Sequence, residues 1–144
     1  MTDQIPQSQP PLTPQQERQW AMIAHLSVLI NLFTVFMGTF VPLVIYFLHK
    51  DRSRYVAYHS MQSFVMQAVC SFGGTLFAVV IGGFSQLLPG IGLICLPVSC
   101  LFAVLPVVAL IYGAYGGIQI NQGNTFKYWM VGDWVGNALG YRES

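Results

Sequence analysis

The sequence has 144 residues, of which 54% are apolar and 8% are charged, and its formal net charge is +1. A soluble domain of average composition carries roughly a quarter charged residues, so this composition excludes an ordinary soluble protein. The small net charge also excludes a nucleic-acid-binding protein, because no basic face is available to neutralise phosphates. We therefore expect an all-α integral membrane protein whose main partner is the lipid bilayer.

The N-terminal segment differs from the rest of the chain. Residues 1–13 are rich in proline and glutamine and poor in large apolar side chains. Such a segment cannot bury enough apolar surface to offset the entropy lost on ordering, which predicts a disordered tail. A helix is expected to begin directly after it, because Thr13 can cap, Pro14 suits the first helical position and Gln16 is placed for a capping box.

The segment from Trp20 to Leu48 decides how many times the chain crosses the membrane. As one helix it would be about 43 Å long, well beyond a hydrocarbon core of about 30 Å. Gly38 and Pro42 lie near its middle, where a helix is easily broken. The favoured interpretation is a hairpin, with a turn around Gly38 and a short second helix from Val41 to Lys50. A three-span protein with a single crossing here is the alternative.

The charge distribution favours the hairpin. Asp, Glu, Lys and Arg are absent from residues 19–49 and 55–126, and three of the six basic residues lie between these stretches. Short cytoplasmic loops collect Lys and Arg, and the hairpin places all six basic residues, including Arg142, on one side. We therefore expect a multi-pass protein of the cell membrane whose termini and 49–59 loop are cytoplasmic. The loop's basic residues should attract anionic lipid headgroups; they are Lys50, Arg52 and Arg54.

Two long helices are expected after the charged loop, over residues 53–83 and 91–120, with an uncharged turn at 85–90. Pro97 and Pro106 should bend or interrupt the second helix. Each helix carries a row of small residues four apart, which lets another backbone approach closely. We expect the two helices to pack face to face, the alternative being contact of one such face with another subunit in a homo-oligomer or larger membrane complex. The rows are Gly74, Ala78 and Gly82, and Ala109, Gly113 and Gly117.

The transmembrane helical domain is predicted to cover residues 14–123, and residues 124–144 are predicted to form an interfacial tail. Several aromatic side chains near the start of this tail suit a membrane–water interface. Three glycines four apart should weaken any helix in the tail and make it partly irregular. The aromatic residues are Phe126, Tyr128, Trp129 and Trp134, and the glycines are Gly132, Gly136 and Gly140.

A few polar side chains fall within or next to the apolar segments. Such residues are expensive in lipid and suggest functional sites. His25 and His59 could bind a haem or pigment or relay a proton, but hydrogen bonds between helices are the favoured explanation. We predict no cofactor. The set consists of His25, Asn31, His59, Gln62 and Gln67.

The sequence lacks the usual signs of catalysis and of metal binding. Its cysteines lie in apolar runs without a metal-ligand spacing, so we expect buried thiols. Its five carboxylates lie near predicted ends, in tails or in the charged loop, where a closed acid–base site could not form. We therefore predict no metal site and no enzymatic activity. The cysteines are Cys70, Cys95 and Cys100.

One segment resembles a known family. "RYVAYHSMQS", residues 54–63, is similar to the aromatic-x-x-aromatic-His-x-Met-Gln segment of the Tic-type chloroplast inner-envelope import components and their small bacterial relatives of unknown function. "WAMIAHLS", "PLVIYFLHKDRS" and "IQINQGNTFKY" resemble other segments of the bacterial proteins. The resemblance implies a four-helix membrane domain with both ends on one side, and protein translocation for the plastid members.

Together these features predict a small non-enzymatic membrane protein that acts as an accessory or scaffold subunit. A translocation or permeation component is one alternative, although a pore would need more polar residues along its helices. A haem- or pigment-binding subunit is the other. The residues with which the protein would contact lipid or a partner are predicted to be Lys50, Arg52, Arg54, His59 and Gln62.

Overall fold

The structure, a computed structural model, describes residues 10–34, 36–87 and 89–141. Regular structure within these ranges is entirely helical, which confirms the all-α prediction for this part of the chain. The predicted disordered N-terminal tail, residues 1–13, lies mostly outside the described ranges, and Arg142 lies outside them as well. The helices are α1 (Pro14–Leu26), the 3-10 helix η1 (Ser27–Ile30), α2 (Asn31–Thr34), α3 (Met37–His49), α4 (Arg54–Gln67), the π-helix η2 (Ala68–Gly73), α5 (Gly74–Leu87), α6 (Pro89–Asn121) and α7 (Val131–Leu139).

The start of α1 has the predicted capping box. The Gln16 backbone N–H donates to the Thr13 hydroxyl at 3.3 Å, and the Thr13 N–H donates to the Gln16 side chain at 3.0 Å. Pro14 occupies the first turn, where its missing N–H leaves no bond unmade. The helix continues through η1 and α2 as far as Thr34.

The predicted hairpin is present, but its turn comes earlier than expected. α2 ends at Thr34 and α3 already begins at Met37, so Gly38 lies inside the second helix. A side chain at Gly38 would collide with the carbonyl oxygen of Ser27 in η1. Gly38 therefore allows the two arms of the hairpin to pack closely. Because a glycine in an apolar segment can also mark a turn, the turn was predicted at Gly38 instead of before Met37.

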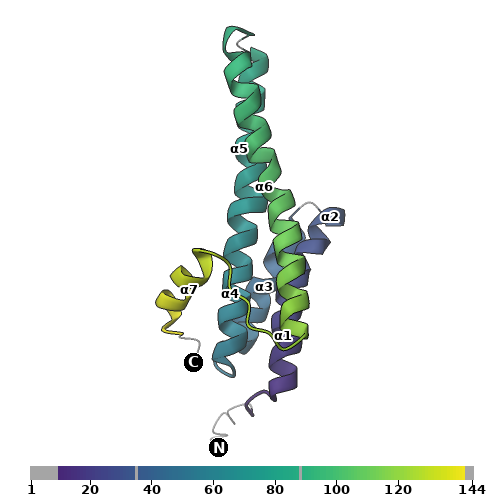
Figure 1. The fold of residues 1–144 in the computed structure, drawn as a ribbon, viewed down its shortest axis with the longest axis vertical. Coiled ribbons are helices and arrows are strands. Elements are labelled where there is room, and N and C mark those ends of the chain that lie inside the picture. The colour runs from purple at the N-terminus through teal and green to yellow at the C-terminus, as the bar shows by residue number, and fades with distance from the viewer. Residues whose placement is uncertain (1–9, 35, 88, 142–144) are drawn as a thin grey trace, which may run out of the picture.

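The second half of the chain forms a longer hairpin. α4, η2 and α5 follow one another from Arg54 to Leu87 without a break, and α6 returns beside them (Figure 1). Both arms are long and apolar enough to cross a membrane. The number of membrane-embedded helices in the whole chain stays a prediction.

α6 continues through Pro97 and Pro106, so the predicted interruption is wrong. At the second proline, the neighbouring helix has a glycine. A Cβ atom on Gly74 would lie 3.2 Å from the Pro106 ring and 2.9 Å from Leu105. The absence of a side chain at Gly74 gives the proline ring space against α5, so α6 continues as a helix past Pro106 in close contact with its neighbour.

The two rows of small residues have different partners. The row on α5 faces α6, because the Ser99 hydroxyl donates to the Ala78 carbonyl at 2.7 Å. The row on α6 faces α1 and η1 instead: a Cβ on Gly113 would lie 2.9 Å from Val28, and one on Gly117 would lie 2.7 Å from Leu26. The rows therefore serve packing within the chain. The expectation that the two long helices pack face to face is confirmed for α5 and α6, although the row on α6 itself packs against the first hairpin.

The C-terminal segment is irregular over residues 122–130, in agreement with the prediction of a partly irregular tail, but it then forms α7, a helix that its glycines were expected to weaken. Two of the glycines that would weaken an isolated helix lie against Tyr58 of α4: a Cβ on Gly132 would be 3.0 Å from its hydroxyl, and one on Gly136 would be 3.6 Å from its ring. The Tyr58 hydroxyl also donates to the Gly132 carbonyl at 3.3 Å. Docking on α4 thus compensates the low helix propensity of glycine in α7.

Candidate functional site

Four buried polar side chains form a stripe along α4. Their spacing of three, one and four residues places them on one face of the helix, and that face meets α1. Burying such a stripe in an apolar protein is costly unless most of its polar atoms find hydrogen-bond partners. The stripe consists of His59, Gln62, Ser63 and Gln67.

Gln62 joins α4 to the segment that follows α6. Its side-chain oxygen accepts from the Tyr128 backbone N–H at 3.3 Å, and its side-chain nitrogen donates to the Phe126 carbonyl at 3.3 Å. Because a backbone N–H only donates and a carbonyl only accepts, these two bonds fix the orientation of the Gln62 amide. The side chain thereby satisfies two backbone groups that no helix or sheet would otherwise pair.

The orientation of Gln62 also fixes the proton on His59. The Gln62 nitrogen lies 2.8 Å from Nδ1 of His59, so Nδ1 accepts and a neutral His59 carries its proton on Nε2. Nε2 is buried and has no hydrogen-bond partner among the described residues. The ring instead packs between aromatic neighbours, with the Tyr55 ring centroid 4.4 Å away.

His25 of α1 connects His59 to Tyr128. Its Nδ1 lies 3.0 Å from the Tyr128 hydroxyl and its Nε2 lies 3.4 Å from Nδ1 of His59. Since His59 Nδ1 is an acceptor, the consistent assignment has His25 donating from Nε2 and accepting the Tyr128 hydroxyl proton at Nδ1. Burial raises the pKa of Tyr128, so this hydroxyl keeps its proton. The hydrogen bonds from Tyr128 through His25 to His59 can thus all form with both histidines neutral.

A second group of polar side chains continues the network toward the hairpin turn. The Gln67 amide donates to the Ser27 and Ser63 hydroxyls, each at 3.1 Å. The Asn31 amide donates to Gln67 at 3.2 Å and to Thr39 at 3.3 Å. The network therefore ties α1, η1, α2 and α3 to α4.

The structure brings together the uncharged residues that the sequence singled out but not the basic ones. His25, Asn31, Gln67, His59 and Gln62 all belong to the buried network. His59 and Gln62, grouped in the sequence with the lipid- or partner-contacting residues, are fully buried.

The basic residues lie at the end of the molecule formed by the 49–54 loop, and two of them have internal partners. Arg52 donates to the Pro10 carbonyl at 3.1 Å, and Arg54 donates to the Leu139 carbonyl at the end of α7 at 3.3 Å. Lys50 is exposed, with its ammonium 5.7 Å from the Phe47 ring. Binding of anionic lipid by these residues stays a prediction.

The sequence missed the hydroxyl members of the network. Ser27, Thr39 and Ser63 are common residue types in apolar helices, and no spacing marked them as partners for glutamine or asparagine. Tyr128 was assigned to the membrane interface together with Trp129 and Trp134. The two tryptophans are exposed, Trp129 by 81%, whereas Tyr128 is buried.

The arrangement suits hydrogen bonding better than cofactor binding. His25 and His59 contact each other directly, which leaves no room for a flat macrocycle between them. Within residues 10–34, 36–87 and 89–141, no three His, Cys, Asp or Glu side chains come together as a metal site would require. The haem or pigment hypothesis therefore finds no support in this geometry.

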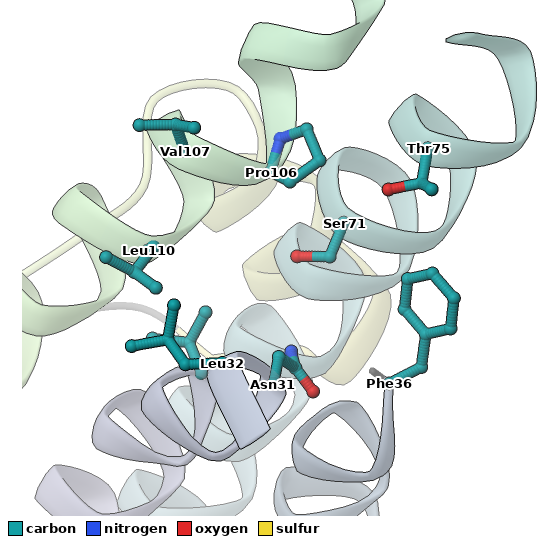
Figure 2. Close-up of a pocket in the computed structure, with 9 residues that line it drawn as sticks. Asn31, Leu32, Phe36, Ser71, Thr75, Pro106, Val107 and Leu110 are labelled. Carbon is teal, nitrogen blue, oxygen red and sulfur yellow. The ribbon is translucent and has the colours of Figure 1, made fainter. Parts of the chain in front are cut away.

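A cavity of about 430 Å³ lies beside the end of the network nearest the hairpin turn. It is bounded by the end of the first hairpin, by η2 and the start of α5, and by the Pro106 turn of α6, and its walls are mostly apolar (Figure 2). The Ser71 hydroxyl points into it from η2 (Figure 2). The cavity is open at one side and its lining offers too few polar groups for a water-filled path.

Comparison with known proteins corrects the family resemblance. No curated protein and no solved structure matches the chain. A family model does match, over residues 16–135, and its description is the MamF/MmsF magnetosome magnetite crystal formation protein family. The resemblance to Tic-type import components is therefore wrong: it depended on one short aromatic-His-x-Met-Gln segment and on apolar helices that many membrane proteins share. Because the match covers nearly all of both hairpins and most of the chain, the protein belongs to the MamF/MmsF family.

Proposed function

We propose that the protein is a non-enzymatic, multi-pass membrane scaffold that supports the formation of magnetite crystals. The family match carries this proposal, because it extends from α1 into α7 and so includes the whole buried network. Membrane insertion is supported by two helices of sufficient length and apolarity and by the large apolar side chains exposed on α3, α5 and α6.

The geometry supports a scaffold over a permeation component. The polar side chains of α4 bond to residues of other helices and to backbone groups, so they stabilise the bundle and do not line a path. Two described carboxylates also have structural partners outside the network: Glu17 accepts from the Ser53 hydroxyl, and Asp133 forms an ion pair with Lys127. These contacts support a non-enzymatic role.

The charge distribution supports a cytoplasmic location for the end that carries the 49–54 loop. α1 begins and α6 ends at this same end of the molecule (Figure 1). The opposite end, where α5 passes into α6, carries no Asp, Glu, Lys or Arg between residues 55 and 126. By the positive-inside rule, the loop end would face the cytoplasm.

The proposal is tested by removing the gene from a cell that forms magnetosomes and restoring it with defined variants. We expect the deletion to change the size or number of magnetite crystals in electron micrographs, and wild-type protein to restore them. A Gln62→Leu variant, which breaks the network, should fail to restore them, whereas Gln86→Leu, on the exposed surface, should succeed. Unchanged crystals after the deletion would refute the proposed role.

A further inference from the structure

The two hairpins differ in length, so the apolar part of the molecule is broad at one end and narrow at the other. α1, η1 and α3 pack against α4 and the C-terminal half of α6. α5 and the N-terminal half of α6 extend beyond the first hairpin as a pair (Figure 1). The broad end is also the end that carries the basic loop.

Contacts between the hairpins show where the broad part ends. Asn31, next to the hairpin turn, donates to Gln67, and the ring of Phe36 in the turn lies 5.4 Å from that of Phe72. The first hairpin therefore ends level with η2. α3 has 13 residues and α5 has 14, so the parts below and above this level are each about 20 Å long.

These lengths place the hairpin turn near the middle of a bilayer. With η2 between them, the two parts form a helix of 34 residues from Arg54 to Leu87, about 50 Å long. This is somewhat more than the thickness of about 40–45 Å of a bilayer that includes its headgroup regions, and η2 lies at the centre of this helix. Apolar side chains are exposed in both parts: Phe33, at the hairpin turn, is exposed by 88%, and Leu93, near the narrow end, by 86%. Lipid would thus cover both parts, but each part would lie mainly in one leaflet.

We propose that the protein is a membrane wedge that favours bilayers curved convexly toward its basic end. Helices are about 10 Å across, so the broad part occupies about twice the area of the α5–α6 pair. A molecule that takes more area from one leaflet than from the other fits best where that leaflet is expanded, which is the outer side of a curved membrane. The proposal depends on the membrane insertion that is part of the proposed function.

The test measures sorting of the full chain between flat and curved membrane. The protein, with a dye at its C-terminus, is reconstituted into giant vesicles of uncharged phosphatidylcholine, and narrow tubes are pulled outward from them. A quencher added outside distinguishes molecules with the C-terminus, and hence the basic end, outside from those in the reverse orientation. We expect several-fold enrichment of the first orientation on the tubes, increasing as the tube narrows, and depletion of the second.

The outcomes separate this proposal from the proposed function. Equal distribution of both orientations between tube and vesicle would refute the wedge while membrane insertion stands. Removal of the protein from the vesicles by alkaline carbonate would refute both.

Paired variants locate the effect in the first hairpin. Phe33→Asn with Met37→Asn makes the hairpin turn polar and should reduce the enrichment, because the turn no longer enters the leaflet. Leu93→Asn with Ile94→Asn changes two similarly exposed residues near the narrow end and should preserve it. Full enrichment of a hairpin variant that keeps wild-type helicity by circular dichroism would refute the wedge. If that variant does not fold, the comparison of the two orientations of the wild-type protein still decides whether the protein acts as a wedge.

Discussion

Gln62 shows how a single side chain can replace regular structure in an apolar protein. Its amide pairs with a carbonyl and an N–H two residues apart, much as a neighbouring strand would, and so fixes the segment after α6 against α4. The same amide determines which nitrogen of His59 carries the proton. The position of the segment after α6 and the tautomer of His59 therefore both depend on Gln62.

Gln62→Leu should destabilise the protein considerably. The substitution leaves the buried Phe126 carbonyl and Tyr128 N–H without partners, and one unsatisfied buried group costs about 1–3 kcal/mol. We expect a loss of about 2 kcal/mol or more in the free energy of unfolding, measured by denaturant titration in mild detergent. Gln86→Leu, on the exposed surface of α5, is the control and should change little. Equal stability of the two variants would contradict the role assigned to Gln62.

Tyr128 should make stability depend on pH in the alkaline range. Burial raises its pKa in the folded protein above the ordinary value near 10. The stabilisation from the neutral hydroxyl is therefore complete below pH 10 and is lost as the pH rises further, because the unfolded chain ionises first.

We expect Tyr128→Phe to cost about 1 kcal/mol near neutral pH, where the bond to His25 is lost. At pH 11 the wild-type protein should lose about 1.4 kcal/mol, because only its unfolded chain ionises at Tyr128. The deficit of the variant should therefore disappear or reverse slightly. Denaturant titrations of both proteins at the two pH values measure this change. A deficit that is the same at both would show that the hydroxyl is not held neutral by the fold.

At the scale of single residues, the sequence identified the large polar members of the network but not their connections. A histidine, asparagine or glutamine in an apolar run is conspicuous because its burial is costly. Its partner is determined by which helix faces which. Gln67 could be recognised from the sequence, whereas its bond to Ser27 required the arrangement of α1 against α4.

At the scale of helices, small residues decide which surfaces come together. Gly113 of α6 lies against Val28 and the His25 carbonyl, which brings α6 close to the first hairpin. Gly83 of α5 is also in an apolar helix, but a Cβ atom added there would meet no neighbouring atom within 4 Å. A larger residue should therefore disturb the packing at Gly113 but not at Gly83.

Gly113→Leu should separate α6 from the first hairpin and cost about 1–3 kcal/mol of unfolding free energy through overpacking. Gly83→Leu should be neutral or slightly stabilising, because the added side chain meets open space. Thermal unfolding in detergent, followed by circular dichroism, compares the two. Similar stability of both variants would show that the α6 row is not a packing surface.

The sequence predicted the helices themselves better than their ends and partners. The start of α1 was correct because a capping box is local chemistry that the residues themselves determine. α7 was missed because its glycines have low helix propensity, and docking on Tyr58 outweighs that propensity. Pro106 was expected to bend or interrupt α6, but the helix continues through it, and Gly74 on the facing helix gives its ring space.

At the scale of the whole molecule, the two hairpins reach different depths. The exposed apolar side chains and the basic end together predict that the first hairpin enters the membrane from the cytoplasmic side and returns without crossing it. The second hairpin would reach the opposite side. Exposure makes Phe33 a better reporter of depth than Gly38, which is buried against η1.

Single-cysteine labelling tests this arrangement in a background in which the three native cysteines are replaced by alanine. Lys50→Cys should react with a membrane-impermeant maleimide from the cytoplasmic side, and Gly90→Cys from the other side. Phe33→Cys should react from neither side, because its position lies in the hydrocarbon region. Labelling of Phe33→Cys from the same side as Gly90→Cys would show that the first hairpin crosses the membrane completely.

The π-helix η2 determines how one continuous helix can serve two different partners. Gln67 and Gly74 are seven residues apart, and in an uninterrupted α-helix they would point in nearly the same direction. Instead Gln67 bonds to η1, whereas Gly74 lies against Phe102 and Leu105 of α6. The wider turn shifts the phase of the helix by about one residue, or about 100°. Deleting one residue from Ala68–Gly73 would remove the extra residue and leave a regular helix with both faces in place. A regular α-helix formed by the full sequence would instead rotate the small-residue row of α5 away from α6, so the register of the second hairpin depends on this irregularity.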